Sequence, residues 1–174
     1  MIRLFLVWAC LAGSVHAQSQ PPDCVVAAID LRQGTAAAFH AEITSLVSAA
    51  DPALAETARA AEEAQSAMRA VRRARVLHLV ASEPAVLTSE TTLSEVMNLQ
   101  GDETSLDALR AANPNFAELE ERRTTAIART QGHPEMERIR TLVRSDLAQD
   151  ITAAAERLNT EMARADALLR TCLN

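Results

Sequence analysis

Several residue types on which common enzyme sites depend are scarce or missing in this chain of 174 residues. All 17 basic residues are arginine, so there is no lysine, tyrosine does not occur, and the only glycines are Gly13, Gly34, Gly101 and Gly132. A phosphate-binding P-loop needs clustered glycines and a lysine, and a pyridoxal phosphate enzyme needs a lysine for its Schiff base. The dinucleotide-binding fingerprint G-x-G-x-x-G also needs closely spaced glycines. The composition therefore excludes these sites without favouring another.

Residues 1–17 have the pattern of a secretory signal peptide. One early positive charge, Arg3, precedes an apolar run, and Val15-His16-Ala17 is a small-x-small cleavage site. The apolar run of about 12 residues is shorter than the roughly 20 that span a bilayer, which disfavours a membrane anchor. A lipoprotein signal at Cys10 is also disfavoured, because the apolar run continues beyond it. We expect cleavage to leave 18–174 as one periplasmic or secreted domain without a transmembrane segment.

Two cysteines remain after the predicted cleavage, Cys24 and Cys172, at opposite ends of the mature chain. Two cysteines in an exported protein indicate one disulfide. A reactive thiol would need a nearby base, and no histidine lies close to either cysteine in the sequence. We therefore expect a disulfide that holds the first and last helices side by side and antiparallel.

The composition predicts an all-α fold. Alanine makes up about a fifth of the chain, while glycine and proline are sparse. Asp23 is a candidate cap for a helix over 23–49, Asp51-Pro52 separates this helix from the next, and Glu83-Pro84 ends the second helix. The short connection between the first two helices favours an antiparallel hairpin.

Shorter helices are expected between residues 84 and 131. A capping box of Thr92 and Glu95, followed by Gly101 as a terminal cap, predicts a helix over 93–100. Further helices are predicted from Asp102 to Ala112 and from Asn113-Pro114 to Thr130, closed by Gly132. Apolar residues at the start of this region could form a flap or a docking edge, but we favour the alternative that they cover the open side of the bundle.

The last part of the chain shows the clearest helical period. From Pro134 onwards, apolar or small residues recur at a spacing of about 3.6, which predicts one continuous helix of about 38 residues with one buried face. These positions are Met136, Ile139, Val143, Leu147, Ile151, Ala154, Leu158, Met162, Ala165, Leu169 and Cys172. The expected architecture is an elongated antiparallel helical bundle with three long helices plus shorter helices between residues 84 and 131.

The strongest candidate for a binding surface is a group of arginines on the second helix. Arg69, Arg72, Arg73 and Arg75 share an arc of about 160° at 100° per residue. Such a face could contact a phosphate, a carboxylate or an acidic protein. The favoured alternative is a solvated face paired with Glu118, Glu120 and Glu121. Nucleic acid is disfavoured, because the chain is acidic, is predicted to be exported, and has few aromatic residues for stacking.

Catalytic and metal-binding patterns are weak. His40, His78 and His133 fall on different predicted segments, and neither HExxH nor CxxCH occurs. His133 and Glu137 are four residues apart, but acidic residues at a helix start are expected to complement the helix dipole. No strained nucleophile elbow such as GxSxG is present, although a dispersed serine triad is not excluded by counting. We predict no metal, no cofactor and no catalytic residue.

Three functional hypotheses follow. The leading one is an exported, non-enzymatic helical-bundle protein of a bacterial periplasm that acts through protein or envelope contacts, with a protein partner expected. The second is a module that binds a small anionic ligand through the arginine face. The third, which we disfavour, is an enzyme with a dispersed site of histidine and carboxylate residues.

Overall fold

The computed structural model describes residues 22–174, and every regular element within that range is helical. The α-helices there are α1 (Asp23–Ala50), α2 (Ala55–Ser82), α3 (Leu93–Met97), α4 (Glu103–Ala112), α5 (Phe116–Thr130), α6 (Pro134–Arg144) and α7 (Ala148–Leu173). Short 3-10 helices, Pro52–Leu54 and Pro84–Val86, follow α1 and α2. The predicted all-α class and its three long helices, α1, α2 and α7, are confirmed. The predicted signal segment, residues 1–17, lies outside the described residues.

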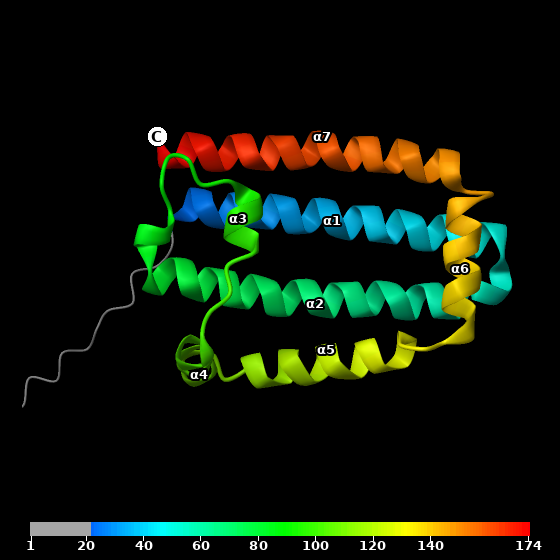
Figure 1. Cartoon of the computed structure of the whole chain (residues 1–174), viewed down its shortest axis with the longest axis horizontal. Coiled ribbons are helices and arrows are strands. Elements are labelled where there is room, and N and C mark those ends of the chain that lie inside the picture. Colours follow the sequence, from blue (N-terminus) through cyan, green and yellow to red (C-terminus); the bar gives the residue numbers. More distant parts are fainter. Residues whose placement is uncertain (1–21) are drawn as a thin grey trace, which may run out of the picture.

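The three long helices and α5 lie side by side in the order α7, α1, α2, α5, and each helix is antiparallel to its neighbour (Figure 1). The main packing contacts run between neighbours in this order, so the bundle is flattened into a single layer of long helices. Helix α3 crosses the layer near one end, and α6 crosses it at the other end (Figure 1). The predicted α1–α2 hairpin and the antiparallel first and last helices are confirmed, and α5 takes the fourth position.

Most helix boundaries follow local signals that the sequence contains. The Asp51 carboxylate accepts a hydrogen bond from the amide two residues later and starts the turn into α2. Thr92 and Glu95 form the predicted capping box of α3, and Asp102 caps α4. Gly132 has a φ of 74°, a conformation that glycine adopts readily, and it separates α5 from α6.

Two predicted helix starts differ from the structure. Helix α1 begins at Asp23 itself after Pro22, so this aspartate adds a negative charge to the first turn and makes no capping bond. Helix α5 begins at Phe116, not at Asn113-Pro114. The Asn113 side chain accepts a hydrogen bond from the Asn115 amide, and the Phe116 amide donates to the Asn113 carbonyl. These bonds form a separate turn before the helix.

The predicted role of Gly101 as a helix cap is wrong. Helix α3 ends at Met97, so the expected helix over 93–100 is too long, and Gly101 does not have a positive φ. A Cβ atom at Gly101 would lie 2.9 Å from Ser105 Cβ and 3.2 Å from Leu79 Cδ2. Glycine is therefore needed where the chain passes close to α2 and the start of α4.

The predicted continuous helix from Pro134 to Cys172 is also wrong. Helix α6 ends at Arg144, and the chain turns over residues 145–147 before α7 begins. A straight helix would carry the α6 residues past the end of the layer, whereas the turn places α6 across the ends of α1 and α2 (Figure 1). This position buries an apolar cluster of Val47, Leu54, Ala58, Ile139 and Leu147. The burial that the turn makes possible explains why the helix is interrupted.

The two larger apolar clusters lie at the two ends of the layer, and two small ones lie along α2: Ala64, Ala67 and Ala126 form one, and Val71, Leu109 and Phe116 form the other. The cluster beneath α3 contains Val25, Ala28, Ile29, Val76, Val80, Leu93, Val96, Met97, Ala165 and Leu169. The region after α2 therefore covers the open side of the bundle, as predicted. By contrast, α1 has no buried residue between Asp30 and Leu46, although it lies between two long helices. The middle of α1 is consequently more accessible than its ends.

Candidate functional site

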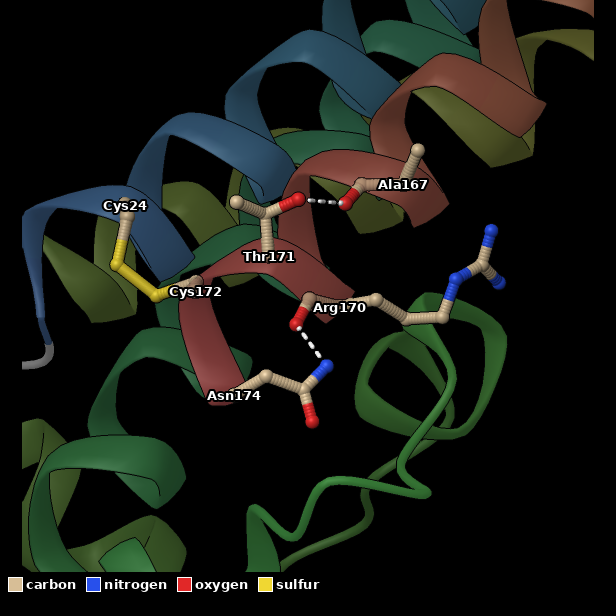
Figure 2. Close-up of a disulfide and its surroundings, with 6 residues drawn as sticks. All are labelled: Cys24, Ala167, Arg170, Thr171, Cys172 and Asn174. Carbon is tan, nitrogen blue, oxygen red and sulfur yellow. Dashed lines mark hydrogen bonds between the residues drawn. A yellow bond between two sulfur atoms is a disulfide. The ribbon is translucent and has the colours of Figure 1, made fainter.

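The predicted disulfide joins the first turn of α1 to the last turn of α7 (Figure 2). The Cα atoms of Cys24 and Cys172 are 5.8 Å apart, and both cysteines pack against the cluster beneath α3. The Asn174 side chain donates a hydrogen bond to the Arg170 carbonyl, which satisfies one acceptor at the end of α7. The two cysteines thus have a structural role, and neither is a free thiol.

The four arginines predicted to form one face of α2 turn to different neighbours. Arg73 faces α1, where its Nε donates to Asp30 Oδ1 at 2.6 Å and its Nη2 donates to Asp30 Oδ2 at 2.9 Å. This paired geometry raises the pKa of Arg73 and lowers the pKa of Asp30, because both hydrogen bonds favour the charged forms. The charge of Arg73 therefore joins α2 to α1.

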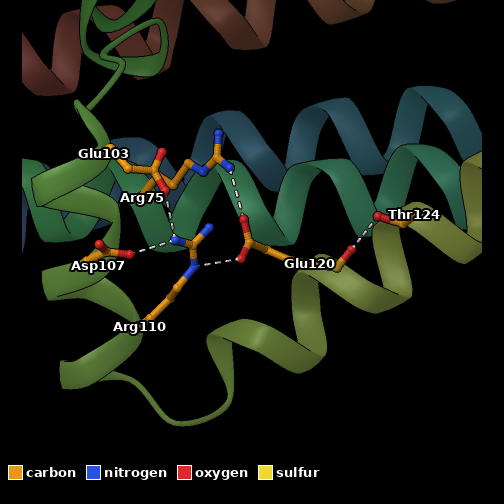
Figure 3. Close-up of polar contacts among 6 residues, drawn as sticks. All are labelled: Arg75, Glu103, Asp107, Arg110, Glu120 and Thr124. Atoms are coloured by element: carbon orange, nitrogen blue, oxygen red, sulfur yellow. Dashed lines mark hydrogen bonds and ion pairs between the residues drawn. The ribbon is translucent and has the colours of Figure 1, made fainter.

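Arg75 faces α5 and takes part in a network of charges (Figure 3). Its Nη2 donates to Glu120 Oε1 at 3.2 Å, and its guanidinium lies 5.9 Å from the centre of the Phe116 ring. Glu120 also accepts from Arg110 of α4. Burial alone would raise the pKa of Glu120, but the hydrogen bonds from Arg110 and Arg75 outweigh it and lower that pKa. The predicted pairing of the arginine face with an α5 carboxylate is confirmed for Glu120.

The remaining carboxylates near this network have other partners. Arg110 Nη1 donates to Glu103 at 3.2 Å and to Asp107 at 2.8 Å within α4, and the bond from Arg110 to Glu120 links these α4 carboxylates to the network (Figure 3). Glu118 and Glu121, which were expected to pair with the arginine face, line a different pocket together with α5 arginines. Arg75 thus faces the meeting point of α2, α4 and α5 and is not on a freely solvated face.

Arg69 lies between α2 and α1. Its Nη1 atom is buried and has no hydrogen-bond partner within residues 22–174. Burial lowers the pKa of Arg69, against the opposing effect of Glu62. Burial also lowers the pKa of His40 on α1, and the positive charge of Arg69 adds to this effect, while Glu62 opposes it. Arg69 and His40 therefore form a partly buried polar group in the middle of the layer.

Arg72 is the exposed member of the four, and it lines a pocket of about 460 Å³ between α2, α5 and the segment that follows α3. The charged residues of the pocket wall are Arg72, Arg75 and Arg123. The other residues are Met68, Val71, Met97, Asn98, Leu99, Gln100, Thr124, Ile127, Ala128 and Gln131. The chain has a net charge of −6, yet no carboxylate lines this pocket. The structure thus places Arg72 in the same pocket wall as Arg75, away from the contact of Arg73 with α1.

Sequence reasoning did not single out Arg123 as a binding residue. The signal was present, because Arg123 shares a helical stripe with Phe116, Leu119 and Ile127, and such a stripe faces the neighbouring helix. An arginine at the border of an apolar stripe extends its guanidinium beyond the packed stem. The structure brings this arginine to the same pocket as Arg72.

A second hollow lies between α1 and α7, with a volume of about 540 Å³. Its wall combines apolar and small residues, Leu31, Gly34, Thr35, Ala38, Phe39, Ala154 and Leu158, with Asp30, Glu42, Arg157 and Glu161. We call it the α1–α7 groove. Each of its carboxylates is already paired, Asp30 with Arg73, Glu42 with Arg157, and Glu161 with Arg164. The groove therefore offers apolar surface with a rim of neutralised charges.

The three histidines of the part of the chain that the structure describes lie apart from one another. His40 lies on α1, His78 on α2, and the His133 side chain caps α6 by accepting from the Glu135 amide. Glu137 pairs with Arg140. Among residues 22–174, no group of three or more histidine, cysteine, aspartate or glutamate side chains is arranged to hold a metal ion.

Within residues 22–174, none of the helices combines the length and the hydropathy of a membrane span. No protein-family model matches the sequence, and no curated protein and no solved structure matches it significantly.

Proposed function

We propose that this chain is an exported, non-enzymatic binding protein that contacts a protein partner through the α1–α7 groove. The observation that supports this proposal most strongly is the unburied middle of α1. From Asp30 to Leu46 every side chain is at least partly exposed, including Leu31, Phe39 and Ile43. Apolar side chains that remain accessible in the middle of a packed layer are a common feature of interaction surfaces.

The chemistry of the groove indicates what it would bind. Its carboxylates are neutralised by arginines of this chain, so a partner gains little from supplying further charge. The exposed faces of Phe39, Leu31 and Leu158 are available for apolar contact. The proposed partner therefore inserts an apolar segment, such as one face of an amphipathic helix, between α1 and α7.

Gly34 offers a direct way to block the groove. A Cβ atom at Gly34 meets no atom within 4 Å, and the residue is exposed, so a large side chain fits there without disturbing the fold. Gly34→Trp would place an indole in the groove. Ala41→Trp is the matched control, because Ala41 is exposed on the same helix and does not line the groove.

The test is site-specific photocrosslinking in the producing cell. A photoreactive phenylalanine analogue replaces Ala38 in the groove or, as a control, Thr152, which is exposed on α7 outside it. We expect one discrete protein adduct from position 38 and none from position 152. Gly34→Trp should abolish the adduct, and Ala41→Trp should preserve it. The proposal is wrong if no discrete adduct forms, if both positions give the same adducts, or if Gly34→Trp leaves the adduct unchanged.

A further inference from the structure

A pocket whose charged residues are all arginines lies on the other half of the layer, between α2 and α5. Arg72 from α2 and Arg123 from α5 line it, and neither has a hydrogen bond or an ion pair to another residue of 22–174. Guanidinium groups bind carboxylates and phosphates through paired, charge-assisted hydrogen bonds. We propose that this pocket binds a small organic oxyanion, whose carboxylate or phosphate group is held by Arg72 and Arg123.

Glu120, the α5 carboxylate of the charge network, does not compete for these two arginines. Glu120 is held by Arg75 at 3.2 Å and by Arg110 at 3.2 Å (Figure 3). It does not line the pocket. Arg75 is positioned in the pocket wall by its hydrogen bond to Glu120 and by its contact with the Phe116 ring. The positive charges of Arg72 and Arg123 consequently stay available to a ligand.

The rest of the pocket wall indicates what the anion is attached to. Neutral side chains that donate or accept hydrogen bonds are Asn98, Gln100, Thr124 and Gln131. The apolar part of the wall is formed by Met68, Val71, Met97, Leu99, Ile127 and Ala128. A pocket of about 460 Å³ falls within the size range of small-molecule sites. The ligand class is therefore a small anion with a short hydrocarbon part, rather than a bare inorganic ion.

This site is independent of the proposed function. The α1–α7 groove and the α2–α5 pocket share no residue. Gly34→Trp should therefore leave anion binding unchanged, and Arg72 and Arg123 variants should leave the groove adduct unchanged. Failure of one proposal can thus be distinguished from failure of the other.

The experiment is isothermal titration of the purified mature chain at low salt with three probes that each contain six carbon atoms. Hexanoate carries a carboxylate, hexyl phosphate carries a phosphate, and hexylammonium is the cationic control. We expect at least one anion to bind and the cation not to bind. Binding should weaken as salt is added, because salt screens an exposed charge pair. Binding by one anion alone would identify the group that the arginines select.

Variants then test which residues hold the anion. Arg72→Gln and Arg123→Gln should each weaken binding about ten-fold or more, since each removes hydrogen bonds between charged groups. Arg122→Gln is the matched control, because Arg122 neighbours Arg123 but lines a different pocket. Circular dichroism of each variant checks that the helices are intact. The proposal is overturned if neither anion binds at millimolar concentration, if hexylammonium binds equally well, or if Arg122→Gln weakens binding as much as Arg123→Gln.

Discussion

The two ends of α1 are held to the neighbouring helices differently from its middle. At one end α3 covers an apolar cluster beside the disulfide, and at the other end α6 covers a smaller cluster. In the middle, α1 is joined to its neighbours by partly exposed ion pairs such as Arg73–Asp30 and Arg157–Glu42. Exposed ion pairs contribute at most about 1 kcal/mol each, whereas a buried leucine contributes several times more. Along α1, stability therefore comes mainly from the two ends, whereas the middle of α2 also contributes buried residues to small clusters with α4 and α5.

This difference explains where binding surfaces can form. Residues that supply the core are constrained by packing, because an interior is filled as densely as an organic crystal. Few residues of the buried apolar clusters line the two sites: the α2–α5 pocket includes Met97 of the cluster beneath α3 and Val71 of another buried cluster, and Leu31 of the α1–α7 groove only packs against the cluster beneath α3. The side chains in the middle of α1 and the arginines of the α2–α5 pocket are therefore free to contact a ligand.

The largest loss of stability is expected from removing the Cys24–Cys172 disulfide, which lies at the end of the layer covered by α3. Replacing both cysteines, Cys24→Ser and Cys172→Ser, removes a link between residues 148 positions apart. In the chain-entropy model such a link stabilises by about 4–5 kcal/mol, because it restricts the unfolded chain. Urea unfolding should show a loss of this order. A loss below about 1 kcal/mol would mean that the disulfide contributes little to this end.

The next largest loss of stability is expected from shortening buried apolar side chains, and half-buried ones should lose less. Leu93 of α3 is completely buried, so Leu93→Ala should lower the free energy of unfolding by about 3 kcal/mol through lost burial and a cavity. Ile139→Ala should cost somewhat less, about 2 kcal/mol, because Ile139 belongs to the smaller cluster and is 8% exposed. Half-buried Leu106 of α4 is the control, and Leu106→Ala should cost less than either. If urea unfolding shows equal losses of the free energy of unfolding at all three positions, burial at the ends of the layer does not decide stability.

Much of the fold could be predicted from local chemistry. Helix content followed from the many alanines, and the boundaries at Asp51, Thr92 and Asp102 followed from side chains that accept backbone hydrogen bonds. The pairing of Cys24 with Cys172 followed from their number and from the predicted export. These features depend on neighbouring residues or on simple counting, so a single sequence is sufficient to predict them.

Features decided by packing could not be predicted in this way. The apolar period continues through residues 145–147, so the sequence pattern cannot show that α6 turns across the layer. The four arginines of α2 were predicted to form one face. In the structure, Arg73 forms an ion pair with α1, whereas Arg75 forms one with α5 on the opposite side. The convergence of Arg72 with Arg123 depends on which helix lies beside α2, and a helical period does not identify that neighbour.

The smallest change in stability is expected from the protonation of His40, which lies in the middle of α1. Burial and the charge of Arg69 hold the pKa of His40 below its ordinary value of 6.5, so the unfolded chain takes up this proton at a higher pH than the folded chain. The free energy of unfolding should therefore fall as the pH drops below about 6.5 and through the lower folded pKa.

His40→Gln should flatten this part of the pH dependence, which urea unfolding between pH 7.5 and pH 5 measures directly. The difference should stay below about 1 kcal/mol, because the ring is only half-buried and solvent screens the neighbouring charges. Arg69→Gln should raise the pKa of His40 in an NMR titration, since it removes the repelling charge. Identical pH profiles for the wild-type chain and His40→Gln would show that the middle of the layer leaves this histidine as solvated as the unfolded chain does.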